Sequence, residues 1–410
     1  WTTTLSLLLA ATAALCSAQY DGHQLLQVFP GDEAQSRLLQ DLMLHDADLD
    51  FWTEPNRVGE PVDVHVPPHR LQAFLAAIGP MTHVVREHNL QTVVAAEKAR
   101  LAKKPRAFDI NDFNTFEDIE DWLGGLSGSC PAGVTCQLVS AGQSFEGRDL
   151  WVFSMSKGAG REVFWMDATI HAREWLATAT ILKMMDHMVS GAADADSMLD
   201  QYDFYFMPVM NPDGYAFTWS SQRLWRKNRR PVGSGCFGAD LNRNFDYSQW
   251  GREGVSSNPC SDIYCGPSGG SEPETQVVQD MAAELAPRGI PAWVTIHAYG
   301  QMWMHPWGHT VNNNGQTCFR GSDHAEMYRV AVEVANAIQG VYNSNWARGT
   351  SCEVIYETTG ATDDYVKETH GVNHPICPEL RGNSFIVNAN QIDPSFREVW
   401  AGIVRFVEVM

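Results

Sequence analysis

The feature that most constrains the fold is an alternation of strand-like and helix-like stretches from about Phe108 onward. The segments 162–170, 204–209 and 292–296 are typical of buried strands, and the segments 174–189 and 323–337 are typical of helices. Strands that alternate with helices imply a sheet that is covered on both faces. We therefore expect residues 107–410 to form an α/β domain with a mixed, largely parallel twisted sheet flanked by helices.

The part of the chain that precedes this domain has a different pattern. Strand-like segments lie at 25–29, 62–66 and 83–86, and helix-like segments lie at 33–44 and 70–78. So many short elements within about eighty residues favour a small antiparallel α+β domain.

A basic stretch, residues 95–107, joins the two parts and is predicted to be helical. Basic helices can bind membranes or nucleic acid, but this one has no aromatic face. We interpret it as a connector that presents cleavage sites to a trypsin-like protease, at Arg100 or at Arg106. The domain prediction is therefore 19–106 for the first domain and 107–410 for the second.

The first eighteen residues resemble a secretory signal peptide. An apolar run from Leu5 to Leu15 is followed by the small residues Cys16-Ser17-Ala18, after which we expect cleavage. The run is too short to span a bilayer. Because the charged segment that normally opens such a peptide is missing and the chain starts at Trp1, we expect residues 1–18 to be truncated at their start. These features predict a secreted, extracellular protein.

The net charge limits the kinds of partner that this chain can have, and the cysteines indicate disulfides. The formal net charge of −20 argues against nucleic acid and anionic membranes as partners, and mildly favours cationic substrates. Apart from Cys16, the cysteines are even in number and contain no Cys-x-x-Cys pair, which favours disulfides over a thiolate metal site. Cys130 and Cys136 are close enough to close a local loop. Nothing in the sequence suggests more than a monomer.

A candidate metal site is formed by His171, Glu174 and the distant His297. Two imidazoles and one carboxylate give zinc three protein ligands and leave one position open, as in catalytic sites. In His-Glu-x-x-His helices the glutamate is the general base. Here Glu174 would itself bind the metal, so the base must come from elsewhere. His-x-x-Glu is a weak signal by itself, and both histidines could instead be hydrogen-bonded core residues.

The surrounding motifs are much more specific. Seven blocks occur in a fixed order, namely 170–175, 210–215, 223–227, 240–244, 295–299, 355–356 and 379–381. In these blocks, and over nearly its whole length, the chain resembles the zinc metallocarboxypeptidases of the pancreatic type, including their proenzymes.

The resemblance implies a catalytic role for six residues. One zinc ion per chain would be held by His171, Glu174 and His297, which is this family's own ligand set. Asp240 would orient a ligand histidine, Glu379 would be the general base, and Arg226 would stabilise the oxyanion. Glu379 could also be a simple carboxylate at the end of a strand. The interval in the sequence from Tyr356 to Glu379 is one residue longer than in the family, and Pro378 stands where the family has an aromatic residue.

The resemblance also implies how a peptide would bind. Arg243, with Asn242 and Tyr356, would receive the free C-terminal carboxylate. Arg173 would contact the substrate further from the scissile bond, or would only pair with a nearby carboxylate. The family's disulfides would be Cys236–Cys260 and Cys318–Cys352, and the pairing of Cys265 and Cys377 stays open.

The position that sets substrate preference in this family is occupied by Asp363. Enzymes that resemble the carboxypeptidase B type carry an aspartate there and prefer terminal Lys or Arg. Alternatively, a one-residue misalignment would make Asp363 and Asp364 a solvated pair. We therefore expect a secreted zymogen of a carboxypeptidase that releases Lys or Arg from peptides or proteins.

Three alternatives are weighed against this expectation. The first is the same hydrolase with an A-like preference for apolar or aromatic ends. The second is a zinc amidohydrolase of acylated amino acids, which would not need the first domain. The third is an inactive binding homologue, against which the presence of Glu379, Arg226 and the three candidate ligands argues.

Overall fold

The computed structural model describes residues 19–55, 58–105, 107–233, 235–313 and 317–410. The predicted signal peptide and Arg106 lie outside these described residues. The chain divides into two compact units: unit 1 holds residues 1–106 with 219–223, and unit 2 holds 107–218 with 224–410. Within the described ranges, no helix combines the length and the apolar character that a membrane crossing requires.

Unit 1 contains a four-stranded antiparallel sheet in the order β2-β3-β1-β4. Its strands are β1 (Gln24–Phe29), β2 (Asp50–Phe51), β3 (Val62–Val66) and β4 (Thr82–Glu87), and its helices are α2 (Glu33–His45), α3 (Leu71–Ile78) and α4 (Leu90–Leu101). Apolar side chains from β1, β3, α2 and α3 pack into one core. Strands β1, β3 and β4 and helices α2 and α3 match the predicted segments to within a few residues, whereas β2 was not predicted. The antiparallel α+β prediction is confirmed.

The connector helix was predicted too far along the chain. Helix α4 begins at Leu90 rather than at residue 95, because the side chain of Asn89 accepts a hydrogen bond from the backbone of Gln91 and caps the helix. It ends at Leu101, before Pro105, whose ring disfavours helical backbone at the preceding residue.

Unit 2 is built on an eight-stranded sheet in the order β13-β12-β14-β11-β7-β8-β6-β5. The strands are β5 (Thr135–Gln143), β6 (Asp149–Ser156), β7 (Glu162–Ala168), β8 (Tyr202–Met207), β11 (Ala292–Ala298), β12 (Met302–His305), β13 (Ala347–Thr350) and β14 (His374–Leu380). The central neighbours β14, β11, β7 and β8 run parallel, whereas β6 and β5 are antiparallel additions at one edge. A small hairpin, β9 (Pro231–Gly233) and β10 (Cys236–Phe237), stands apart from this sheet.

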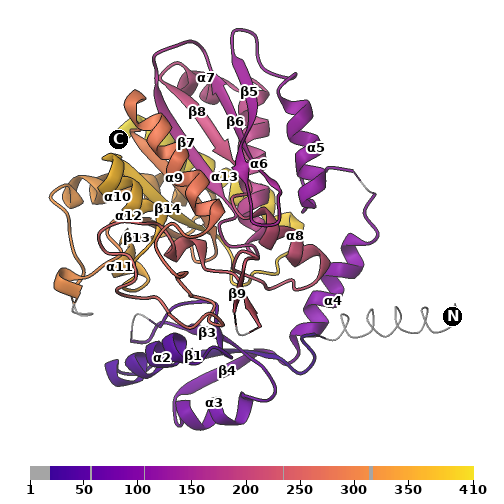
Figure 1. Cartoon of the computed structure of the whole chain (residues 1–410), viewed down its shortest axis with the longest axis vertical. Helices are drawn as coiled ribbons and strands as arrows, with labels where there is room; N and C mark the ends of the chain where they lie inside the picture. Colours follow the sequence, from indigo (N-terminus) through magenta and orange to yellow (C-terminus); the bar gives the residue numbers. More distant parts are fainter. Residues whose placement is uncertain (1–18, 56–57, 106, 234, 314–316) are drawn as a thin grey trace, which may run out of the picture. The chain divides into compact units, whose positions relative to one another are not determined.

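Helices cover both faces of this sheet (Figure 1). They are α5 (Phe116–Leu126), α6 (Trp175–Val189), α7 (Ala193–Leu199), α8 (Pro212–Ser220), α9 (Pro273–Leu285), α10 (His324–Tyr342), α11 (Ser351–Val354), α12 (Thr362–His370) and α13 (Ile392–Val409). Helices α6, α10 and α13 pack together on one face, and α9 and α12 pack on the other. This arrangement confirms the predicted mixed sheet between helical layers.

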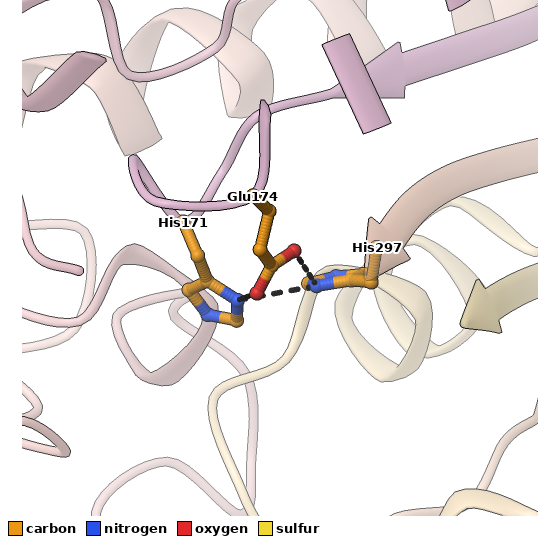
Figure 2. Close-up of side chains that lie close together, drawn as sticks. All are labelled: His171, Glu174 and His297. Atoms are coloured by element: carbon orange, nitrogen blue, oxygen red, sulfur yellow. Dashed lines mark hydrogen bonds and ion pairs between the residues drawn. The ribbon is translucent and has the colours of Figure 1, made fainter. Parts of the chain in front are cut away.

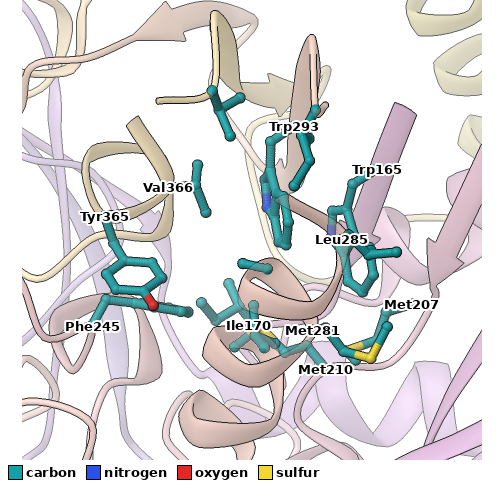
Figure 3. Close-up of a cluster of buried hydrophobic side chains, with 14 of the residues drawn as sticks. Trp165, Ile170, Met207, Met210, Phe245, Met281, Leu285, Trp293, Tyr365 and Val366 are labelled. Carbon is teal, nitrogen blue, oxygen red and sulfur yellow. The ribbon is translucent and has the colours of Figure 1, made fainter. Parts of the chain in front are cut away.

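The apolar residues of β7 are continuous in the sequence because both faces of this strand are buried. Successive side chains on a strand point to opposite faces. Trp165 stacks on Trp293 of β11 and packs with α9 and α12, in the cluster that Figure 3 shows. The next residue back, Phe164, contacts Phe406 of α13 on the opposite face. Both faces are therefore buried, and neither position tolerates a polar residue.

Among the residues that the structure describes, three disulfides are formed, and all lie in unit 2. They are Cys130–Cys136, Cys236–Cys260 and Cys318–Cys352, and all three pairings were expected from the sequence. Cys265 and Cys377 are buried and free.

Candidate active site

Three buried side chains converge at the carboxyl ends of the central strands β7 and β11 in unit 2 (Figure 2). Glu174 lies between two imidazoles: its Oε1 is 2.7 Å from His171 Nδ1 and its Oε2 is 3.2 Å from His297 Nδ1. The two Nδ1 atoms are 3.2 Å apart. Among the residues that the structure describes, this is the one group of three or more His, Cys, Asp and Glu side chains close enough to hold a metal ion.

The 3.2 Å separation of the two Nδ1 atoms fits a tetrahedral zinc ion, whereas Glu174 Oε1 and His171 Nδ1 lie at hydrogen-bond distance. Zinc–nitrogen bonds of about 2.0–2.1 Å at tetrahedral angles place two ligand nitrogens about 3.3 Å apart. Two imidazoles and a carboxylate are also a typical donor set of catalytic zinc. Burial alone would raise the pKa of Glu174, but the neighbouring His171 and His297 lower it far below its usual value. The carboxylate is therefore ionised and ready to bind a cation.

The chain brings these residues together through its parallel strands. His171 and Glu174 lie in the turn between the end of β7 and the start of α6, which Glu174 precedes directly. His297 lies inside β11, one residue before its end, because β11 extends two residues further than the predicted strand 292–296, up to Ala298. The backbone NH of Ala298 then donates to Glu174 Oε2 at 3.1 Å.

Asp240 joins the metal-site histidine to an arginine. Its Oδ1 is 3.2 Å from His171 Nε2, and its Oδ2 accepts hydrogen bonds from Arg226 Nε at 3.1 Å and Nη2 at 2.9 Å. Although burial opposes ionisation, Arg226 and His171 hold the pKa of Asp240 well below its usual value. The carboxylate therefore fixes the orientation of both partners.

Glu379 lies on β14, beside the strand that carries His297. The parallel register pairs Glu379 with His297, and on its other side Glu379 pairs with Met302 of β12. Directly paired residues on neighbouring strands project to the same face of a sheet. The half-buried carboxylate of Glu379 is thus directed to the same face as His297.

Arg243 and Tyr356 form a second centre of polar groups. Arg243 Nη2 donates to the hydroxyl of Tyr356 at 2.5 Å, while its Nη1 and Nε donate to the backbone oxygens of Asn242 and Gly254. The amide of Asn242 lies between this centre and the metal site, because its Nδ2 is 3.5 Å from His297 Nε2. The guanidinium is therefore held rigidly close to the three candidate ligands.

Arg173 is placed differently from the other candidates. Its side chain is almost completely buried, its guanidinium lies 4.2 Å from the centre of the Phe385 ring, and its Nη1 donates to Leu224. Arg173 is thus held between the Phe385 ring and the backbone of Leu224.

Asp363 is buried near the start of α12 and is not part of a solvated pair. Burial, followed by the charge of Asp364, raises the pKa of Asp363 to about 7. Asp364 is fully buried too, but it accepts hydrogen bonds from Tyr247 Oη and from the backbone NH of Gly308. The two neighbouring carboxylates thus have different surroundings.

Two residues beside Asp363 were not recognised from the sequence. Ser351 Oγ is 3.2 Å from Asp363 Oδ2. The thiol of Cys377 lies within electrostatic reach of both Asp363 and Glu379, and its pKa is raised well above the usual value by burial and then by Asp363. Cys377 could have been found from strand alternation, since it precedes Glu379 by two residues on β14. Ser351 had no such signal.

Comparison with known proteins agrees with this geometry. Residues 119–402 match the zinc carboxypeptidase family, and residues 26–97 match the carboxypeptidase activation peptide. Carboxypeptidase A2 of Rattus norvegicus is 33% identical over 422 residues, which cover 98% of each chain. Carboxypeptidase B of Astacus astacus is 37% identical over 301 residues, covering 72% of this chain and 96% of its own. The crystal structure of carboxypeptidase A from Helicoverpa armigera aligns with a TM-score of 0.84 at 29% identity, over 95% of this chain and 98% of that one.

The fold and the site define a metallohydrolase of the α/β class. More narrowly, the chain belongs to the zinc carboxypeptidase family and carries that family's activation peptide. It is a peptide hydrolase in zymogen form.

Proposed function

We propose that this chain is the secreted, monomeric zymogen of an exopeptidase that releases C-terminal Lys or Arg from peptides and proteins. The observation that carries the substrate preference is the buried carboxylate of Asp363. No basic side chain among the described residues forms an ion pair with it, so a cation from the substrate is its natural partner. A-type and B-type relatives are both similar to this chain, so the preference rests on the site itself.

We assign one zinc ion to His171, Glu174 and His297. The ion would supply Lewis-acid chemistry, polarising the substrate carbonyl and making water nucleophilic near neutral pH. Asp240 accepts the hydrogen of His171 Nε2, which leaves Nδ1 unprotonated and available as a ligand.

The proton transfers and the oxyanion are assigned to two further residues. Glu379, on the same face as His297, takes a proton from the attacking water and returns one to the leaving amine. Arg226 donates to the oxygen on which negative charge develops, and its hydrogen bonds to Asp240 keep it from having to reorganise during the reaction. A fixed donor of this kind contributes about 3–4 kcal/mol of transition-state stabilisation.

Restriction to chain ends is assigned to Arg243. An internal peptide bond has no negative charge to offer, whereas a terminal carboxylate can form charge-assisted hydrogen bonds with the guanidinium and with Asn242 and Tyr356. Only a peptide whose last residue reaches Arg243 places its final bond at the metal site.

Selection of Lys or Arg is assigned to Asp363. A buried, ionised carboxylate is costly unless a cation pairs with it. A terminal Lys or Arg provides that cation, while an apolar side chain leaves the carboxylate uncompensated. The pocket therefore favours basic residues and rejects others.

Activation is assigned to removal of residues 19–106 by a trypsin-like protease. The match to the activation peptide covers 26–97, and α4 carries the basic residues that follow. Because proteases cleave extended chain, cleavage at Arg100 requires the last turn of α4 to unwind.

An A-like preference is the alternative that one observation favours. Met304, Val354 and Cys377 form a small apolar cluster, and Cys377 also lies close to Asp363. These residues could pack against an apolar terminal side chain when Asp363 is protonated.

The test compares kcat/KM for matched peptides that end in Arg and in Phe. Full-length protein is treated with limited trypsin, and each assay is repeated after chelation and after zinc is restored. Chelator-sensitive preference for Arg, lost in Asp363→Asn, is the expected result. Preference for Phe in the unmodified enzyme would overturn the assignment of Asp363, and unimpaired turnover without zinc would overturn the metal site.

A further inference from the structure

Ser351 is directed towards Asp363 by the way α11 begins. Thr350 caps this helix: its hydroxyl accepts from the backbone of Glu353, and Glu353 accepts in return from the backbone of Thr350. The capping box thus needs nothing from Ser351, the first residue of the helix. The buried Ser351 hydroxyl is therefore available to Asp363 Oδ2, at 3.2 Å.

The Ser351 hydroxyl can serve Asp363 in both of its protonation states. A hydroxyl has one hydrogen to donate and can also accept. When Asp363 is ionised, Ser351 donates to it. When Asp363 is protonated, the carboxyl group can donate to Ser351 Oγ, and the hydroxyl can turn to the backbone oxygen of His305 at 3.4 Å. The bond to the ionised form is the stronger one, because it is charge-assisted.

The backbone NH of Asp364 stabilises the Asp363 anion most, and apart from it and Ser351 the surroundings offer an anion little. Asp364, on the same helix, repels it, and Cys377 on β14 remains a neutral thiol. Tyr247 donates its hydroxyl to Asp364 instead. His297 on β11 is the last contributor that lowers the pKa of Asp363. Ser351 is thus the side-chain hydroxyl that stabilises the anion, next to the backbone NH of Asp364.

We propose that Ser351 is a specificity-determining residue, whose hydroxyl positions and stabilises the Asp363 carboxylate so that the pocket prefers a cationic terminal side chain to a neutral one of the same shape. This inference rests on the proposed role of Asp363. Ser351 is a positioning residue, because it acts on the substrate through Asp363.

The experiment uses two peptides that differ only in their last residue, Arg or its uncharged analogue citrulline. The ratio of their kcat/KM values is measured with the trypsin-activated enzyme on both sides of the Asp363 pKa of about 7. The proton transfers and the oxyanion are common to both substrates, so their pH dependence cancels in the ratio. In the unmodified enzyme the ratio should rise with pH as Asp363 ionises.

Three variants separate positioning from general packing. Ser351→Ala should lower the Arg-to-citrulline ratio at neutral pH by about tenfold and move its pH midpoint up by about one unit, as loss of one charge-assisted hydrogen bond implies. Ser351→Thr keeps the hydroxyl and should restore both values. Ser395→Ala removes another buried serine hydroxyl, on α13, and should change neither.

The outcomes distinguish this inference from the proposed function. If the unmodified enzyme prefers Arg but Ser351→Ala keeps its ratio and midpoint, the role of Ser351 is refuted while that of Asp363 stands. An equal loss of activity on both peptides would also refute it, since packing alone would then be affected. If the unmodified enzyme does not distinguish the two peptides at any pH, the proposed function itself fails.

Discussion

Replacing Asp240 by Asn tests whether one carboxylate organises both the metal site and the oxyanion site. Asp240 accepts four hydrogen bonds: from His171 Nε2 and the backbone of Asn242 at Oδ1, and from two nitrogens of Arg226 at Oδ2. An amide offers one oxygen and one NH2 group. Whichever way it is oriented, its NH2 faces donors, so two of the four bonds are lost.

Each orientation has a measurable cost. If the NH2 group faces His171, the imidazole must shift its hydrogen to Nδ1, the proposed ligand atom, or leave its place. Loss of such a partner typically weakens metal binding by about 10–100-fold. In either orientation the largely buried guanidinium of Arg226 loses its counter-ion, which costs about 3–5 kcal/mol of stability. If the NH2 group faces Arg226, its two hydrogen bonds are lost as well.

The assay is competition for zinc against a chromophoric chelator, together with unfolding in denaturant of the metal-free and zinc-loaded protein. Asp393→Asn is the matched control, because Asp393 is a half-exposed carboxylate of unit 2 that pairs with Lys183 and Arg397. An Asp240→Asn protein that binds zinc as tightly as the unmodified protein, and is equally stable, would refute the reasoning.

Three further outcomes are expected. In Gly360→Ala the new Cβ, at a φ of +82°, would lie 2.2 Å from the backbone oxygen of Arg243, so KM for peptides should rise while zinc affinity stays the same, as steady-state kinetics and chelator competition can show. In unit 1, burial and the nearby His65 and His69 lower the pKa of His23 from 6.5 to about 4. As the pH falls, the unfolded chain therefore takes up a proton at His23 before the folded chain does, and the stability of unit 1 decreases between these two pH values. His65 Nε2 is 2.8 Å from His23 Nδ1, and His23→Asn keeps a hydrogen-bond donor towards it. This variant should make unit 1 more resistant to limited proteolysis in acid. Equal sensitivity of the variant and the unmodified protein to acid would contradict this. Removal of zinc should destabilise unit 2, by about 4 kcal/mol when free zinc is a thousand times its Kd, and leave unit 1 unchanged in differential scanning calorimetry.

The central sheet could be predicted from the sequence because its strands are buried on both faces. Strands β7, β8 and β11 show this as nearly continuous apolar residues. The edge strand β5 gives no such signal, since its residues alternate between half-buried and exposed positions and include several polar ones. Its place is decided by pairing with β6, a contact that no local pattern encodes. Strands β7, β8 and β11 were predicted, whereas β14, β12 and β6, which also lie inside the sheet, and the edge strands β5 and β13 were not.

The candidate site likewise contains residues that a short sequence motif identifies and residues that only folding brings together. His171 and Glu174 are three residues apart, so their joint role is visible in a short motif. The link between Asp240 and Arg226 depends on how two loops meet, and the hydrogen bond of Ser351 to Asp363 joins the starts of two separate helices. Such contacts have no sequence period. They become visible only when the chain is folded.

The distribution of buried charge explains why a site of this kind would act on chain ends. Glu174 and Asp240 contribute two negative charges, and Arg226 and Arg243 contribute two positive charges, so these four groups balance without a metal. A zinc ion adds two positive charges, of which an ionised Glu379 compensates one. The loaded site then keeps an excess of positive charge in a largely buried place, where electrostatic interactions are strong. The terminal carboxylate of a peptide removes that excess, and an internal peptide bond cannot. Asp363 lies outside this balance, so under the proposed function its charge would be compensated by a cation that arrives with the substrate.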